Sequence, residues 1–173
     1  MQGYNRFQSI VHWISATVIA FLLITGTFIL SEVPNSDPDK LGKLTIHAIV
    51  GGVALVLILF RIVWALKTQQ PPHIETGAPV MDKLGALAPK LLNILSLVVV
   101  LSGVAMGIGS GLMELIVTGM GELPEDFFGS PVRIVHGLSS KVLFAGVIIH
   151  ILAALMHQLV KKDQIMSRIS PFN

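Results

Sequence analysis

The chain has 173 residues, of which 53% are hydrophobic and 13% are charged, and it contains no cysteine. A soluble domain carries about 25% charged residues, so this composition excludes a soluble globular protein, a disordered chain and a nucleic-acid binder. The pI near 9.1 rests on a net charge of only +2. The lack of cysteine excludes disulfides, thiolate metal sites and iron–sulfur clusters, which leaves six histidines as candidates for metal or cofactor chemistry.

Four apolar stretches are long enough to cross a membrane, which takes about 20 mostly apolar residues. We predict helices over about 8–31, 44–66, 88–110 and 132–160. The chain is therefore predicted to be an all-α integral membrane protein, a four-helix bundle that forms a single domain over residues 1–173. The first stretch is too long for the core of a signal peptide and is expected to remain in the protein.

The connections between the stretches are mostly polar and rich in turn residues. His73 lies in the Pro-rich second connection and is expected to be solvated. The third connection, 110–130, is apolar from Leu112 to Met120, and that part is expected to lie on the membrane surface.

Lysine and arginine residues indicate the orientation of the chain, because they are enriched in cytoplasmic loops. With the N-terminus inside, eight of them lie on the inner side: Arg6, Arg61, Lys67, Lys83, Lys90, Lys161, Lys162 and Arg168. The outer side holds Lys40, Lys43 and Arg133, and Lys141 lies within the fourth span. Both termini are therefore expected to be cytoplasmic, with the chain crossing the membrane four times.

Histidines inside the spans fall at two depths. His136 and His150 are fourteen residues apart on the fourth span. They therefore share one face of a helix and lie roughly 21 Å apart along its axis. His47 lies early in the second span, at the same outer depth as His136. His12, early in the first span, matches the inner depth of His150.

Two neutral imidazoles at one depth on facing helices are what a bis-histidine haem b requires. The pairs predict two haems, ligated at the iron by His12 with His150 at the inner level and by His47 with His136 at the outer level. The alternative for any single histidine is a packing residue or a proton relay. A haem-free transporter built on such a relay remains a further class, although the spans contain no paired carboxylates.

Other polar residues near these levels have more than one interpretation. Arg61 could pair with an inner haem propionate or snorkel to the membrane surface beside Trp64. Arg133 and Lys141 could contact an outer propionate or a substrate. His157 follows His150 by seven residues on nearly the same face, and it could contact a quinone, replace His150 as a ligand, or lie among the lipid head groups.

Small residues accompany the histidines and let helices or a flat macrocycle approach closely. They are Gly51, Gly52, Gly103, Gly107, Gly137 and Gly146. Ordinary helix–helix packing explains any one of them equally well.

Several segments resemble the bacterial cytochrome b561 family of four-helix, dihaem inner-membrane proteins. They are YNRFQSIVHW at 4–13, IHAIVG at 46–51, RIVWALK at 61–67 with PP at 71–72, and the His136, His150, His157 series followed by Lys162 and Asp163. The family's ligand pattern falls on the same two histidine pairs as the depth argument.

The resemblance implies transmembrane electron transfer through two b haems to or from membrane ubiquinone. Members similar in length act as superoxide:ubiquinone oxidoreductases, in which periplasmic superoxide reduces the outer haem, and Arg133 matches a basic position of that group. Such a protein would be an enzyme whose partners are the lipid bilayer, the quinone and a small or periplasmic electron donor, with no nucleic acid. The outer loops, however, are acidic, with seven carboxylates against three lysines and arginines. The alternative is therefore a haem-bearing membrane-anchor subunit that carries electrons for a separate dehydrogenase or reductase.

Overall fold

The computed structural model describes residues 3–72, 79–127 and 129–172, and every regular element in those ranges is helical. His73 lies outside the described residues. The elements are α1 (Arg6–Thr25), the π-helical turn η1 (Gly26–Leu30), α2 (Lys40–Lys67), α3 (Pro79–Gly109), α4 (Leu112–Thr118), α5 (Pro131–Leu155), the π-helical turn η2 (Met156–Lys161) and the 3₁₀ helix η3 (Ile165–Ile169). The described chain contains four helices that are long and apolar enough to cross a membrane. The prediction of an all-α membrane four-helix bundle is thus confirmed.

Local sequence signals explain where the helices begin. Asn5 caps α1 by accepting a hydrogen bond from the Gln8 amide at 2.8 Å, and the Gln8 side chain returns a bond to the Asn5 amide. Proline opens α5 at Pro131 and α3 at Pro79, where its missing N–H costs nothing. The third helix therefore begins at Pro79 rather than near residue 88, because its first turns precede the apolar stretch from which the span was predicted.

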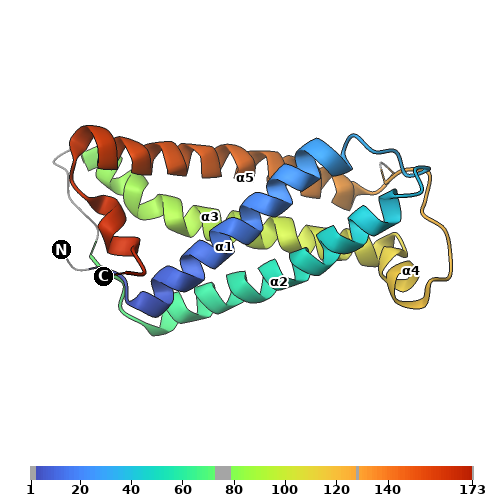
Figure 1. Cartoon of the computed structure of the whole chain (residues 1–173), viewed down its shortest axis with the longest axis horizontal. Helices are drawn as coiled ribbons and strands as arrows, with labels where there is room; N and C mark the ends of the chain where they lie inside the picture. The colour runs from blue at the N-terminus through green and yellow to red at the C-terminus, as the bar shows by residue number, and fades with distance from the viewer. Residues whose placement is uncertain (1–2, 73–78, 128, 173) are drawn as a thin grey trace.

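The four long helices lie side by side, and α1 crosses the bundle obliquely (Figure 1). At one end α1 packs on α2, where the Phe7 ring lies 5.3 Å from the Trp64 ring. At the other end its extension η1 reaches α5, where the rings of Phe28 and Phe144 lie 6.0 Å apart. Among the described residues, close backbone packing joins α3 with α5, α2 with α3, and α1 with α2, but not α1 with α5 or α2 with α5.

A small buried cluster fills the middle of the bundle. Leu23 of α1, Val99 of α3 and Leu143 of α5 form it, with partly buried neighbours on the same three helices. Leu143 is seven residues from His136 and seven from His150. The apolar cluster therefore separates the two histidine levels.

Both termini lie at one end of the bundle, which we call the terminus end (Figure 1). There η3 is held against α1: the Tyr4 amide donates to the carbonyl of Arg168 at 2.8 Å, and the Trp13 indole donates to the carbonyl of Ile169 at 3.0 Å. The Arg168 guanidinium donates to the carbonyl of Pro72 at 2.6 Å. The C-terminal segment thus joins the start of α1 to the connection after α2.

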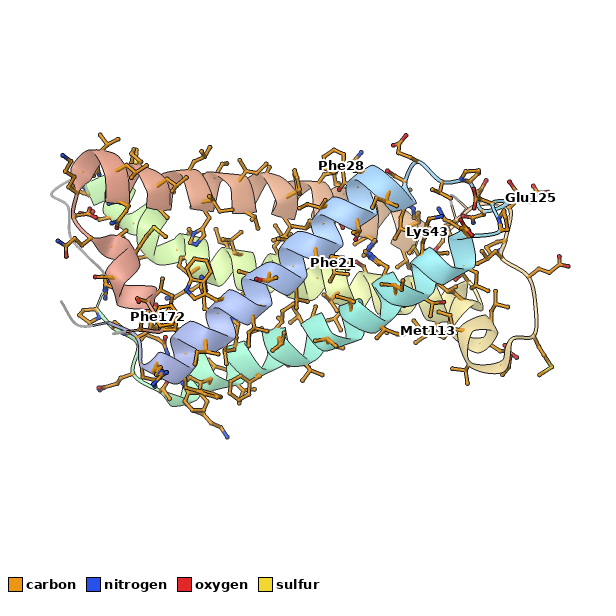
Figure 2. All side chains as sticks on the ribbon, viewed as in Figure 1. Phe21, Phe28, Lys43, Met113, Glu125 and Phe172 are labelled. Carbon is orange, nitrogen blue, oxygen red and sulfur yellow. The ribbon has the colours of Figure 1, made fainter. Side chains whose placement is uncertain are left out.

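The opposite end, which we call the loop end, carries α4 and the longer connections. Figure 2 shows Lys43, Met113 and Glu125 there, and Phe172 at the terminus end. Leu112 and Leu115 of α4 are buried, whereas Val117 is 82% exposed. One face of α4 therefore packs on the bundle, and the surface location predicted for this apolar segment stays a prediction.

Candidate functional site

The structure brings together the histidines that helix spacing pairs. His12 lies close enough to His150 for their rings to interact electrostatically, and the same holds for His47 and His136. All four side chains are partly buried within the bundle. Along α5 the two levels are fourteen residues apart, or about 21 Å at the helical rise. Each pair also joins two helices that do not pack closely backbone to backbone.

His136 is held in one tautomer by α3. Its Nδ1 lies 2.9 Å from the carbonyl oxygen of Val99. A carbonyl only accepts hydrogen bonds, so Nδ1 carries the proton and donates it. The Ser102 hydroxyl donates to the same carbonyl at 2.8 Å and lies 3.2 Å from Nδ1. The lone pair of His136 is therefore on Nε2, the arrangement that a metal-binding histidine requires.

Gly103 allows this close approach. A Cβ atom at residue 103 would lie 3.0 Å from Cε1 of His136 and 3.3 Å from Nδ1. The two shorter distances are tighter than nine in ten real Cβ contacts, and all three neighbours of this Cβ are atoms of the His136 ring. The glycine predicted to assist packing here has a definite role, because it makes room for the imidazole against α3.

His47 faces a less complete environment. A Cβ at Gly26 would lie 3.3 Å from Cε1 of His47, so the π-helical start of η1 lies directly against this ring. Within the described part of the chain, the buried Nδ1 atom of His47 has no hydrogen-bond partner. One turn further along α2, a Cβ at Gly51 would meet nothing within 4 Å. The His47 face of α2 therefore combines an unsatisfied ring nitrogen with open space.

The terminus-end level contains a cation. Arg61 of α2 interacts electrostatically with both His12 and His150 and is partly buried. Among the described residues it forms no ion pair with a carboxylate. An unpaired guanidinium in the apolar part of a bundle needs an anion. This location beside the two rings favours the propionate interpretation of Arg61 over snorkelling.

Further polar atoms at the terminus end are unsatisfied. Ser9, one turn before His12, is fully buried, and its hydroxyl has no hydrogen-bond partner among the described residues. The Trp64 indole N–H and the Gln158 amide oxygen are also buried without partners. Native proteins rarely leave such groups unpaired, so the region is built to contact something polar.

Arg133 and Lys141 differ in their surroundings. Arg133 folds along α5 over Gly137, where a Cβ would lie 2.6 Å from its Nη1, and it interacts electrostatically with His136 and Lys40. Lys141 is exposed on α5, and within the described residues it makes no hydrogen bond or ion pair. The structure therefore brings Arg133 to the His136 level, and the contact predicted for Lys141 stays a prediction.

His157 lies in η2, and its Nδ1 is in hydrogen-bonding contact with a carboxylate oxygen of Asp163. His150, rather than His157, is the histidine that interacts with His12. Because His157 has a carboxylate partner within the chain, it differs from a residue that only lies among the lipid head groups.

Sequence reasoning missed several of these residues. Val99 and Ser102 act through a carbonyl and a local hydroxyl inside an apolar run, and neither leaves a signal in the sequence. Ser9 was detectable, because a polar residue one turn before a membrane histidine shares its face. Lys40 is predicted only to lie on the outer side, but the structure buries it, and its ammonium donates to the carbonyls of Leu30, at 2.6 Å, and Val33.

Comparison with known proteins agrees with this arrangement. A family model described as prokaryotic cytochrome b561 matches residues 3–171. The chain belongs to the prokaryotic cytochrome b561 family. A protein named cytochrome b562, from Cereibacter sphaeroides, is 28% identical over 171 residues, covering 96% of this chain and 94% of its own length.

Membership of the cytochrome b561 family supplies the broad function. This family member is a multi-pass bacterial membrane protein that carries out haem-based electron transfer across the bilayer. Its cofactor is haem b, and the residues present fit that group. The described chain holds no cluster of three or more metal-ligating side chains, but bis-histidine ligation needs only facing pairs.

Proposed function

We propose that this cytochrome carries electrons between a donor at the loop end and ubiquinone near the terminus end, through two haems b. The ligands of one haem are His12 and His150, and those of the other are His47 and His136. The single observation that carries the proposal is the pairing of the four rings at two levels of one bundle. In this proposal the whole chain, residues 1–173, is one cytochrome b domain in the bacterial inner membrane.

The surroundings of the rings support the proposal. When bound, each haem supplies an iron centre that takes up and releases one electron. Val99 and Gly103 fix the ring and tautomer of His136. Arg61 provides a cation for an inner propionate, and Arg133, folded over Gly137, provides one at the outer level.

Alanine substitution of the four histidines tests the pairing. Each single variant should lose one haem of the two per chain, because the remaining ligand of that level cannot hold the iron alone. The double variant His12→Ala with His150→Ala should still retain one haem, whereas His12→Ala with His136→Ala should retain none. Haem is quantified per purified chain by its reduced-minus-oxidised visible spectrum. His73→Ala is the control and should keep both haems, while a double variant within one level that loses all haem would contradict the pairing.

The electron donor that the family resemblance implies is periplasmic superoxide. Arg133 beside His136 offers an anion one positive charge near the outer level. Two lysines at this end already have partners in the chain. The Lys40 ammonium donates to two carbonyls, and Lys43 pairs with Asp39 at 3.5 Å. Rapid mixing of the oxidised protein with superoxide tests the donor, and haem reduction that is lost in Arg133→Gln but kept in Lys43→Gln is expected.

A second candidate follows from the charge of the loop end. Its acidic side chains, most of them exposed, are Glu32, Asp37, Asp39, Glu114, Glu122, Glu125 and Asp126. This surface suits a basic soluble electron donor or a partner dehydrogenase, for which the protein would be the membrane anchor. Haem that stays oxidised with superoxide, yet is reduced by a basic protein donor in a salt-sensitive reaction, would favour this candidate.

The quinone is assigned to the terminus end, near Arg61 and His157. The unsatisfied Ser9 hydroxyl and Gln158 amide oxygen support a polar ligand there. Oxidation of the pre-reduced haem by a short-chain ubiquinone is the measurement that tests this assignment. His157→Ala should slow that oxidation without changing the haem content.

A further inference from the structure

The chain makes an unusual turn directly after η2. Lys162 has φ 55° and Gln164 has φ 56°, and both are residues other than glycine in the left-handed region. Such conformations are unfavourable for a residue that carries a Cβ atom, and they persist only where the surroundings enforce them. The two residues flank Asp163, so the strained backbone serves to direct this one side chain.

The turn brings the Asp163 carboxylate back onto η2. One carboxylate oxygen accepts a hydrogen bond from Nδ1 of His157, and the other accepts from the amide of Ile165 at 3.2 Å. The Asp163 side chain is 24% exposed and that of His157 is 17% exposed. The pair therefore reaches from the aqueous surface into the bundle.

The electrostatics of the pair favour an ionised carboxylate. The hydrogen bond from His157 is the main cause that lowers the pKa of Asp163, and nearby Lys161 acts in the same direction. From η3, which packs against η2, the charged side chain is Arg168, whose guanidinium donates to the carbonyl of Pro72. A carboxylate on Nδ1 leaves Nε2, at the opposite edge of the ring, as the nitrogen that can exchange a proton.

We propose that Asp163 is a positioning residue that holds His157 as the proton donor for quinone reduction and opens this proton path to the terminus end. The inference rests on the proposed function, because it needs a quinone near His157. It adds Asp163 to the residues that serve the quinone, and it assigns the source of the protons to the terminus end.

Quinone reduction needs one proton for each electron. Reduction of a quinone to a quinol takes two electrons, delivered along the protein's electron path, and two protons. The imidazolium of His157 gives the proton on Nε2 to a carbonyl oxygen of the quinone as an electron arrives. The neutral ring keeps the proton on Nδ1, which stays hydrogen-bonded to the Asp163 carboxylate. Water at the exposed edge of the pair then returns a proton to Nε2. The second electron and the second proton follow by the same route.

Asp163→Asn tests the step, with Asp163→Glu and Asp39→Asn as companions. Asp39 is the matched control, because its exposed carboxylate pairs with Lys43 at the opposite end of the chain. The haem-loaded proteins are reduced, mixed with short-chain ubiquinone over a range of pH, and followed by haem oxidation. Redox-induced infrared difference spectra give a second readout of the carboxylate and the imidazole.

Asp163→Asn should slow haem oxidation by at least about 10-fold, a part of the roughly 100-fold to 10,000-fold that general acid catalysis contributes, with unchanged haem content and visible spectrum. Asp163→Glu should recover part of the rate. Only in Asp163→Asn should the infrared signal of the Asp163 carboxylate vanish and that of the His157 imidazole shift.

Two results would overturn the inference, and they are distinguishable. If Asp163→Asn matches the wild type and Asp39→Asn in rate, pH dependence and infrared signals, the role of Asp163 is wrong while the quinone function stands. If quinone fails to oxidise the haem of the wild-type protein, the proposed function itself is wrong, and the proton path falls with it.

Discussion

The imidazole of His136 is positioned by groups on another helix. The Val99 carbonyl fixes the proton on Nδ1, Ser102 adds a hydroxyl, and Gly103 provides the space. Partners of this kind orient metal-binding histidines, and their loss typically costs 10-fold to 100-fold in metal affinity.

Gly103→Ala should displace the His136 ring, because the added Cβ would lie 3.0 Å from Cε1. The expected result is a loss of the outer haem, or an affinity lower by about 10-fold to 100-fold, measured by haem titration into the purified apoprotein. Gly109→Ala is the matched control on the same helix, since a Cβ there meets nothing within 4 Å. Equal haem affinity in the two variants would contradict the role of Gly103.

At the scale of elements, the oblique path of α1 determines where the histidine pairs can form. Phe7 holds its start on α2, and Phe28 holds its extension on α5. The path is fixed at the loop end by Lys40 of α2, which is 5% exposed and whose ammonium donates to the carbonyls of Leu30 and Val33. A lysine bonded to the last carbonyls of a helix both satisfies them and complements the helix dipole.

Lys40→Ala should destabilise the protein, because it leaves the carbonyls of Leu30, the last residue of η1, and of Val33, in the connection that follows, without their donor. The expected loss is about 1–3 kcal/mol. Lys43→Ala removes only an exposed pair with Asp39 and should cost under about 1 kcal/mol. Thermal unfolding of both variants in the same detergent measures the difference, and equal melting temperatures would show that Lys40 does not hold α1 in place.

At the scale of the whole molecule, the two ends differ in charge. Eight lysines and arginines are assigned to the terminus end, and seven carboxylates to the loop end. Because positive residues are retained on the cytoplasmic side, we expect the terminus end to face the cytoplasm. Electron transfer between the two histidine levels would then cross most of the membrane.

Single cysteines test this orientation cleanly, because the chain contains none of its own. Phe172, 92% exposed, and Glu125, also exposed, lie at opposite ends of the bundle (Figure 2). A membrane-impermeant thiol reagent added to spheroplasts should label Glu125→Cys at once and Phe172→Cys only after permeabilisation. The reverse pattern would invert the orientation and place the quinone end outside.

The sequence by itself determined the class of the protein and its histidine levels. Uncharged stretches of about 20 residues indicate membrane helices, because a helix satisfies its backbone polar groups within one segment. The fixed rise and rotation of a helix then place His136 and His150 on one face, fourteen residues apart. These quantities depend on local geometry, and local geometry is readable from residue spacing.

Only the tertiary structure decided what surrounds each ring. The Val99 carbonyl is a backbone group, identical in every residue, so no sequence pattern identifies it as the partner of His136. The burial of Lys40 and the return of Asp163 onto His157 depend on chain turns between elements. Contacts between distant segments depend on how helices cross, and spacing along one helix does not contain that information.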